Sequence, residues 1–407
     1  MHRLGRTMDR RLSVYLDFLR FAAAMAVFFS HASEAAYTSL MPAMLSDFGH
    51  DGVIIFFVLS GFVIAYVSER KEHTWRDFGL SRAARIYSVA VPAIALTIVL
   101  DAARTTMVPT LHIYQFHELG FYIPYWLAFG TDWWFFNETM LSNGPFWSLS
   151  YEVWYYIIFG ALFYFRGWRR WIFAALALAI VGPRQWLLFP IWLAGCALYY
   201  RHERWPLRRS TARCLFFGSI VIYAALKSVH AYDAIDAVVN RALGGFPYHY
   251  LRYSQFFLSD YLIGVLAIIN IYALRYCDFG LFARHARPIR LAASFTFSLY
   301  LFHMPLLKFF RAAFGTDLRS FWAWVLLLTA TLVSVVLLGL VTEWRKREVK
   351  RLLAAGLSLV DGVRSKIVQA RPLPRGLSRW FSTTQPDSVA TPDAATPARP
   401  PGTRRSS

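Results

Sequence analysis

The chain has 407 residues, of which 57% are hydrophobic, 18% aromatic and only 16% charged, with a formal net charge of +19. Soluble domains average about 25% charged residues, so the composition argues against a soluble protein and predicts an all-α, polytopic membrane protein. The positive charge does not call for nucleic acid, because cytoplasmic loops of membrane proteins collect Lys and Arg.

Ten apolar segments follow one another along the chain and are predicted to cross the membrane as helices. They lie near 12–34, 48–67, 81–101, 144–165, 169–183, 185–200, 212–227, 255–274, 291–312 and 320–343. About 20 apolar residues are needed to span the hydrocarbon core. A further apolar run at 119–131 is shorter and contains Pro124. We expect this run to be re-entrant or interfacial rather than a crossing.

Arginine-rich loops alternate with loops that are poor in Lys and Arg. Basic residues precede the first segment and follow the second, fourth, sixth and eighth, whereas 35–47 has none. By the positive-inside rule, both termini are expected to be cytoplasmic. This alternation holds only if 119–131 does not cross.

The composition divides the chain into two parts. Residues 1–345 form the predicted transmembrane domain, and 346–407 form a tail that is first basic and then rich in Pro, Ser, Thr and Ala. Such a composition cannot build a core, so we expect most of the tail to be disordered. The scattered cysteines Cys196, Cys214 and Cys277 lack metal-ligand spacing. We therefore predict no metal and no permanently bound cofactor.

The first apolar segment contains an arginine and a histidine on one predicted helical face. Arg20 and His31 are eleven positions apart, which is three helical turns plus about 20°, or about 16 Å along the axis. Asp17 lies three residues before Arg20 and can pair with it. Intramembrane charges normally face a bundle interior or a wet cavity. A structural Asp17–Arg20 pair with an interfacial histidine is the alternative interpretation.

Five motifs together resemble one family, the integral-membrane acyltransferase 3 family. They are LDFLRFAAAMAVFFSH (16–31), GHDGVIIFFVLSGF (49–62), SRAARIY (81–87), WSLSYEVWYY (147–156) and SFTFSLYLFHMP (294–305). The resemblance implies a bundle of about ten helices in the bacterial inner membrane. It also implies transfer of an acyl group, often acetyl from a cytoplasmic acyl-CoA co-substrate, to hydroxyls on saccharides or other envelope molecules. The acceptor can be lipid-linked, and the bilayer itself is the other expected partner.

The resemblance implies catalytic roles for His31, Arg20 and Glu152. Imidazole titrates near neutral pH, so His31 is the expected general base, with a transient acyl-histidine as the alternative. Glu34 can orient His31 or be a solvated loop residue. Glu152 is placed to polarise the histidine or bind the acceptor, but a structural partner for a buried arginine explains it nearly as well.

The remaining candidates bind the donor or line the site. Arg82 and Arg85, neighbours on one helical face, are expected with Arg20 to bind coenzyme A phosphates, although positive-inside flanking also explains them. Asp17, Ser60, Tyr300 and His303 are expected to line the site, with pairing to Arg20, packing or helix-stabilising roles as the alternatives. The main rival function is a transporter that uses Arg20, His31 and Glu152 as a substrate or proton pathway.

Overall fold

The computed structural model describes residues 9–34, 48–134, 136, 138–201, 206–242, 244, 250–315 and 320–370. Among the described residues, the regular secondary structure is helical, and the helices are joined by turns and irregular segments that include an isolated bridge between Met140 and Asn143. The prediction of an all-α fold is therefore confirmed. The predicted tail beyond about 371 and the loop at 35–47 lie outside the described residues.

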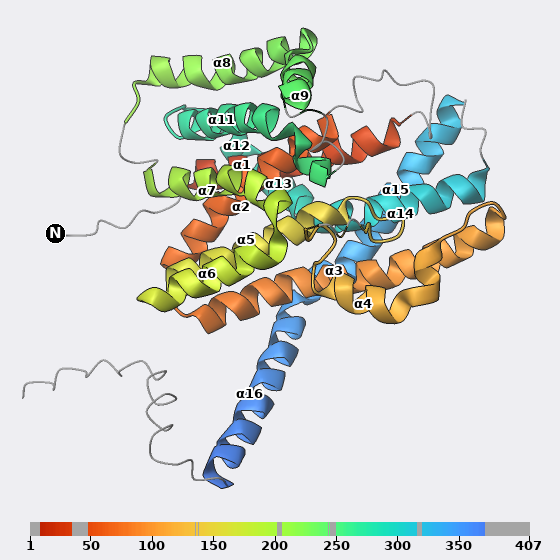
Figure 1. The fold of residues 1–407 in the computed structure, drawn as a ribbon. Helices are drawn as coiled ribbons and strands as arrows, with labels where there is room; N and C mark the ends of the chain where they lie inside the picture. Colours follow the sequence, from red (N-terminus) through yellow and green to blue (C-terminus); the bar gives the residue numbers. More distant parts are fainter. Residues whose placement is uncertain are drawn as a thin grey trace, which may run out of the picture. The chain divides into compact units, whose positions relative to one another are not determined.

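The first half of the chain contains the helices that build most of the candidate site (Figure 1). They are α1 (Arg10–Ala32), α2 (Phe48–Arg70), α3 (Trp75–Met107), η2 (Tyr114–Glu118), α4 (Leu119–Leu127), α5 (Phe146–Tyr164), α6 (Trp168–Val181) and α7 (Pro183–Arg201).

The second half adds shorter helices between its long ones. They are α8 (Arg209–Ser228), α9 (Ala231–Ala242), η3 (Arg252–Phe256), α11 (Phe257–Leu274), α12 (Gly280–Arg284), α13 (Ala286–Ser294), α14 (Thr296–Phe314), α15 (Phe321–Thr342), η4 (Glu343–Arg345) and α16 (Lys346–Ala370). By its internal contacts the chain divides into two compact units, Met1–Leu353 and Ala354–Ser407.

Within the described part of the chain, six stretches are long and apolar enough to cross a membrane. They are α1, α2, α3, the η3–α11 stretch Arg252–Leu274, α8 and α15. Helices also occupy the four other predicted ranges, as α5, α6, α7 and α14. The count of ten crossings stays a prediction. The run at 119–131 contains α4, whose nine residues are about 13 Å long and too short to span the core.

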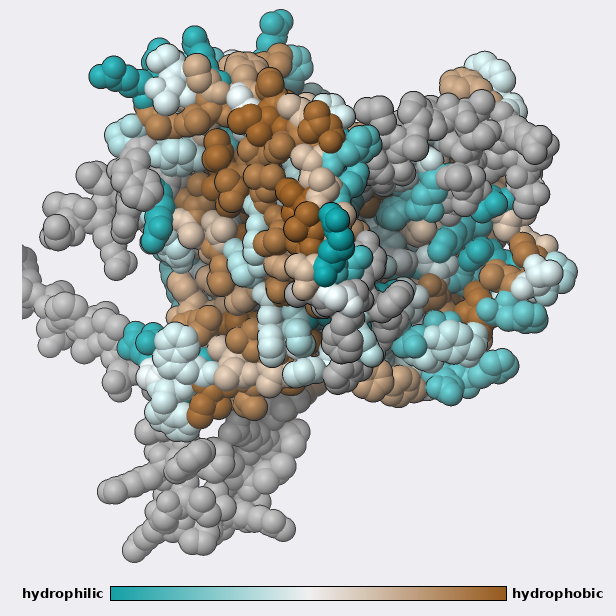
Figure 2. All heavy atoms as spheres, turned by 45° about the horizontal axis from the view of Figure 1, so that its top comes forward, coloured by the Kyte–Doolittle hydropathy of each residue, from teal (hydrophilic) through white to brown (hydrophobic). Residues whose placement is uncertain are grey.

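A broad apolar face suits a lipid environment. Figure 2 shows this face in brown, with hydrophilic side chains gathered mainly at its edges. Large apolar side chains are exposed along α8, for example Phe217, Val221 and Ile222. In water such a face would favour aggregation, whereas in a bilayer it contacts hydrocarbon at no cost.

The helix α2 lies at the centre and packs against α1, α7, α11 and α5. Its contact with α7 depends on two glycines. A Cβ atom at Gly61 would lie 2.0 Å from the Trp192 carbonyl oxygen, and one at Gly195 would lie 2.2 Å from that of Val58. Only glycine allows the two backbones to approach this closely.

The helix α14 packs against α1, α3 and α15 and contains Pro305. Proline has no N–H, so the carbonyl of Leu301, one turn earlier, loses its helical donor. The side chain of Asn143 replaces that donor, because its Nδ2 lies 2.8 Å from the Leu301 oxygen. This bond fixes the segment before α5 against the middle of α14.

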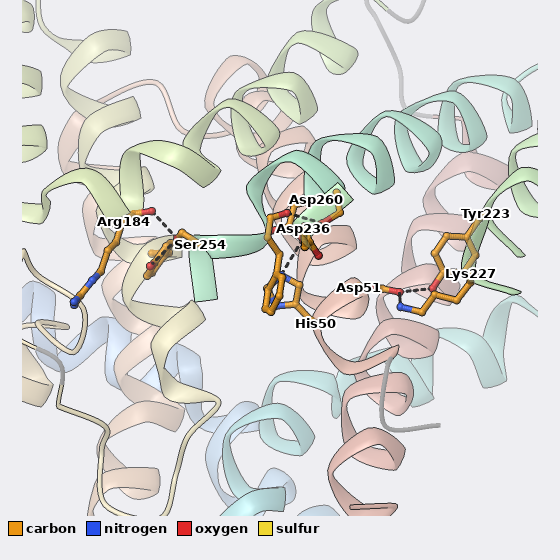
Figure 3. Close-up of polar contacts among 11 residues, drawn as sticks. His50, Asp51, Arg184, Tyr223, Lys227, Asp236, Ser254 and Asp260 are labelled. Atoms are coloured by element: carbon orange, nitrogen blue, oxygen red, sulfur yellow. Dashed lines mark hydrogen bonds and ion pairs between the residues drawn. The ribbon is translucent and has the colours of Figure 1, made fainter. Parts of the chain in front are cut away.

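The same segment is held at its other side by buried charges. Arg184, at the start of α7, lies 3.5 Å from Asp132 and donates to the Phe136 carbonyl, while Ser254 donates to the Arg184 carbonyl (Figure 3). Arg252 adds a second guanidinium 3.7 Å from Asp132. Asp132, Phe136 and Asn143 thus tie this segment to α14, α7 and η3.

Candidate active site

A cavity between α1, α2, α3, α5 and α14 contains most of the residues predicted from the sequence. Its polar lining residues include Arg20, Ser60, Arg82, Arg85, Glu152 and Tyr300. Valine, leucine and phenylalanine side chains from α2 and α14 form much of the remaining wall. The free volume is about 60 Å³, room for a few water molecules. The cavity is therefore a narrow polar space inside an apolar bundle.

Glu152 is the centre of a hydrogen-bond network in this cavity. Ser60 Oγ donates to Glu152 Oε1 at 2.6 Å, and Tyr156 OH donates to the same oxygen. Trp192 Nε1 in turn donates to Ser60 Oγ at 3.1 Å. The network connects α5, α2 and α7. It holds the Glu152 carboxylate in place in the cavity that the Arg20 side chain lines from α1.

Arg20 lies between the cavity and a second, strongly basic pocket. Its guanidinium is 3.7 Å from Asp17, as the sequence predicts, and it interacts electrostatically with Glu152 and Arg85. Arg20, Arg85 and Val63 line both spaces. The two spaces are therefore adjacent and share the two guanidinium groups.

The basic pocket has a volume of about 460 Å³, within the range of small-molecule sites. Five cationic side chains line it, and they are Arg10, Arg20, Lys71, Arg85 and Arg290. Asp17 is the only carboxylate among the described residues of its lining, and Arg290 lies 3.9 Å from it. Such an excess of positive charge favours a ligand with several negative charges.

Arg82 and Arg85 are neighbours on α3 but face different surroundings. Arg82 pairs with Glu72 at 2.9 Å and lies over the rings of Phe78 and Tyr156. It lines the cavity and an apolar groove between α3, α5 and α6, but not the basic pocket. Arg85 is the member of the pair that reaches the basic pocket.

His31 lies outside the lining of the cavity, near the end of α1. Its Nδ1 is 2.7 Å from Glu34 Oε1. Because an ionised carboxylate only accepts, Nδ1 carries the proton and Nε2 has a free lone pair. Its ring stacks on His303 with a centroid distance of 5.4 Å, and His303 contacts Tyr300 at 6.3 Å. A row of three rings therefore connects His31 to the cavity.

The two other residues of that row have structural hydrogen bonds. His303 Nδ1 is 2.8 Å from the Leu299 carbonyl, so the nitrogen donates to its own helix. Tyr300 OH contacts Ser148 Oγ at 2.5 Å and donates to the Pro145 carbonyl at 3.1 Å. These bonds fix the ring orientations between α14 and α5, which agrees with the helix-stabilising alternative for His303.

The comparisons with known proteins identify the family. The model of a family described as "Acyltransferase domain", acyltransferase 3, matches residues 13–344. The chain belongs to this acyltransferase family. The exopolysaccharide production protein ExoZ of Rhizobium meliloti is 33% identical over 136 residues. That alignment covers 33% of this chain and 40% of ExoZ. No solved structure matches the chain.

Family membership and the apolar helices together make this acyltransferase-family chain a multi-pass membrane protein. The family match ends where η4 begins, so it covers the whole helical bundle that surrounds the cavity. It also covers nearly all of the basic pocket, in which only Arg10 precedes the matched residues.

The structure adds residues that the sequence analysis did not assign to a site. They include three residues of the basic pocket, Arg10, Lys71 and Arg290. The sequence analysis used basic residues of this kind only to infer the topology. Tyr156 follows Glu152 by one helical turn, a spacing that could have identified it. His50 and Asp260 come from α2 and α11, 210 positions apart, and no local pattern could have paired them (Figure 3).

Proposed function

We propose that the protein is a membrane O-acyltransferase that moves an acyl group, most simply acetyl, from acyl-CoA to a saccharide hydroxyl. Family membership supports the reaction class, and the name of the ExoZ relative supports a polysaccharide acceptor. The observation that carries the proposal is the basic pocket joined to a polar cavity through Arg20 and Arg85. A polyanionic donor with a long uncharged arm fits this arrangement.

The basic pocket is the proposed site for the phosphates of coenzyme A. Guanidinium groups bind phosphate through two parallel hydrogen bonds, and Lys71 adds a point charge. Arg85 and Arg20 stand where the pocket meets the cavity, so they would hold the end of the phosphate chain from which the pantetheine arm leaves. Arg82 would then border the arm rather than the phosphates, since it lines the cavity but not the basic pocket.

His31 is the proposed general base. With Nδ1 bonded to Glu34, its Nε2 takes the proton from the acceptor hydroxyl. The oxygen attacks the thioester carbonyl carbon, the C–S bond breaks, and the thiolate leaves and is protonated. The products are an O-acyl ester and free coenzyme A. Glu34 would act as a positioning residue that also stabilises the imidazolium.

The thioester must travel from the basic pocket to His31. The helical spacing between Arg20 and His31 is about 16 Å, comparable in scale to a pantetheine arm. The cavity has room for only a few water molecules, and the rings of Tyr300 and His303 lie along the way to His31. The proposal therefore requires these side chains to move apart when the donor binds, so that the carbonyl carbon meets the imidazole.

Transfer by purified protein tests the proposal. The protein is reconstituted in nanodiscs with radiolabelled acetyl-CoA and surface polysaccharide from a strain that lacks the gene. We expect label in the polysaccharide with wild type and none with His31→Ala, while both bind coenzyme A equally. Absence of label with wild type, together with movement of saccharide across vesicles, would replace the enzyme with a transporter.

A further inference from the structure

A second histidine–carboxylate pair lies outside the lining of the cavity. His50 is in the first turn of α2 and Asp260 in the first turn of α11, and Nε2 is 2.9 Å from Oδ1 (Figure 3). The carboxylate can only accept, so Nε2 carries a proton, and Nδ1 is left for a second hydrogen bond. The His50 side chain is 24% exposed, which leaves the ring partly accessible.

Burying the Asp260 carboxylate costs more free energy than a contact that only holds two helices together requires. The Asp260 side chain is only 1% exposed, and Oδ2 has no hydrogen-bond partner among the described residues. Two further carboxylates, Asp51 and Asp236, interact electrostatically with it. A buried, half-satisfied carboxylate usually destabilises a fold relative to an apolar contact of the same shape. Such groups concentrate at functional sites.

A neighbouring contact shows what a purely structural tie looks like. Asp51, the next residue of α2, accepts from Lys227 Nζ at 2.9 Å and from Tyr223 OH at 2.5 Å (Figure 3). Both donors come from α8, so this group ties α2 to α8 as His50 ties it to α11. The carboxylate of Asp51 is paired with a full positive charge, whereas that of Asp260 is paired with an imidazole.

Aromatic rings hold His50 in a defined orientation. Its ring lies nearly parallel to Trp147, at 6.1 Å and 14°, and Trp147 stacks on Tyr253 at 4.2 Å. Phe256 contacts the ring edge-on at 5.3 Å. A flat aromatic surface beside a few fixed polar atoms is the usual make-up of a small-molecule site.

The pair lies at the level of His31 and next to the cavity. A Cβ at Gly49 would lie 2.6 Å from Ser30 Oγ, so the residues before His50 and His31 touch across α1 and α2. Val53, one turn after His50, lines the cavity. Ser148, the residue after Trp147, lines it as well. A molecule beside His50 would therefore reach the region where His31 is proposed to act.

We propose that His50, oriented by Asp260, is an acceptor-binding residue. Its Nδ1 would form a hydrogen bond with a saccharide hydroxyl other than the one that is acylated, beside the Trp147–Tyr253 stack. This inference rests on the proposed function, because it takes the acceptor to be a saccharide. It assigns binding to the His50–Asp260 pair and proton transfer to the His31–Glu34 pair.

The test removes each ion pair as a unit, so that no buried charge is left alone. The double variant His50→Phe/Asp260→Leu is compared with the control double variant Asp51→Asn/Lys227→Met, which removes the tie between α2 and α8. For each protein, equilibrium binding of the unacylated polysaccharide is measured without donor. Coenzyme A binding is measured as a check on folding, and transfer kinetics are measured against polysaccharide concentration.

We expect the His50/Asp260 variant to bind polysaccharide at least tenfold more weakly and to raise the acceptor KM to match. Its kcat and coenzyme A affinity should stay within twofold of wild type, and the control should resemble wild type throughout. Unchanged polysaccharide binding would overturn the inference, as would a fall in kcat with unchanged KM. If wild type binds polysaccharide through His50 but never acylates it, the proposed function is contradicted while the role of His50 in binding is kept.

Discussion

Arg85 and Arg290 face the basic pocket from two different helices, α3 and α13. Replacing either by Ala should weaken coenzyme A binding, because a charge-assisted hydrogen bond to phosphate contributes about 1.5–3 kcal/mol. That range corresponds to roughly a 10- to 100-fold rise in the dissociation constant. Calorimetric titration of the protein in nanodiscs measures it.

The control for this prediction is on the same helix as Arg290. Arg287 belongs to α13 but does not line the pocket. Arg287→Ala should leave coenzyme A affinity unchanged at physiological salt, where distant surface charges are screened. Equal losses in all three variants would mean that general positive charge, and not this pocket, attracts the donor.

Glu343 gives a pH dependence that can be assigned to one residue. It follows α15, its Oε1 accepts from the Ser298 backbone N–H at 3.0 Å, and burial raises its pKa to about 7. The folded protein therefore disfavours the ionised form of Glu343. The contribution of Glu343 to the free energy of unfolding is fully present below about pH 4.5 and decreases as the pH rises to about 7. Glu343→Gln keeps the acceptor without the charge.

The measurement compares thermal unfolding of wild type and Glu343→Gln at pH 5 and pH 8. Between pH 5 and pH 8, the free energy of unfolding should fall by on the order of 2–3 kcal/mol more in wild type than in the variant. Other titrating groups are common to both proteins and cancel in the difference. Parallel curves would show that Glu343 is ionised at both pH values.

At the scale of single residues, the sequence predicted the members of the site better than their partners. The Arg20–His31 spacing and the Arg82–Arg85 pair follow from helical periodicity alone. The different surroundings of Arg82 and Arg85 do not follow from periodicity. Arg82 pairs with Glu72, and this pair depends on the conformation of the loop that precedes α3. His50 and Asp260 meet only after α2 and α11 have packed, so no sequence spacing encodes their contact.

At the scale of helices, the contact between α2 and α7 depends on the absence of side chains. Gly61→Ala would place a methyl group on the Trp192 carbonyl oxygen, and backbone cannot move aside as a side chain can. We expect a loss of roughly 1–3 kcal/mol, typical of overpacking. Gly218→Ala on α8 meets no atom within 4 Å and should be neutral or slightly stabilising.

Denaturant titration in mild detergent distinguishes these two variants. The displacement at Gly61 should also reach Ser60, so transfer activity is expected to fall together with stability in that variant. If Gly61→Ala matched Gly218→Ala in both stability and activity, the close approach of α2 and α7 would not be required.

Apolar periodicity predicted the long apolar helices because lipid allows few alternatives to a helix. It did not predict the 25-residue helix α16, which forms the basic start of the predicted tail. It did not predict α9, α12 and α13, which are short and carry polar residues. It also could not show how α14 tolerates Pro305. That depends on Asn143, a residue 158 positions from the carbonyl it satisfies.

At the scale of the whole molecule, the arginine alternation predicts that both termini are cytoplasmic and that 119–131 does not cross. Cysteine labelling tests both parts in a background without Cys196, Cys214 and Cys277. A cysteine at Thr110, between α3 and η2, should react with an impermeant maleimide added to spheroplasts. A cysteine at Ser406 should react only after lysis. Labelling of Ser406→Cys in intact spheroplasts would contradict the topology.

The most direct test of the central claim is mass spectrometry of the cell's surface polysaccharide. Cells with the wild-type gene should show repeating units that are heavier by one acyl group than units from cells without it. Cells that carry His31→Ala, at equal protein levels, should lack this increment. Polysaccharide that is identical with and without the gene, or that keeps the increment with His31→Ala, would contradict acyl transfer through His31.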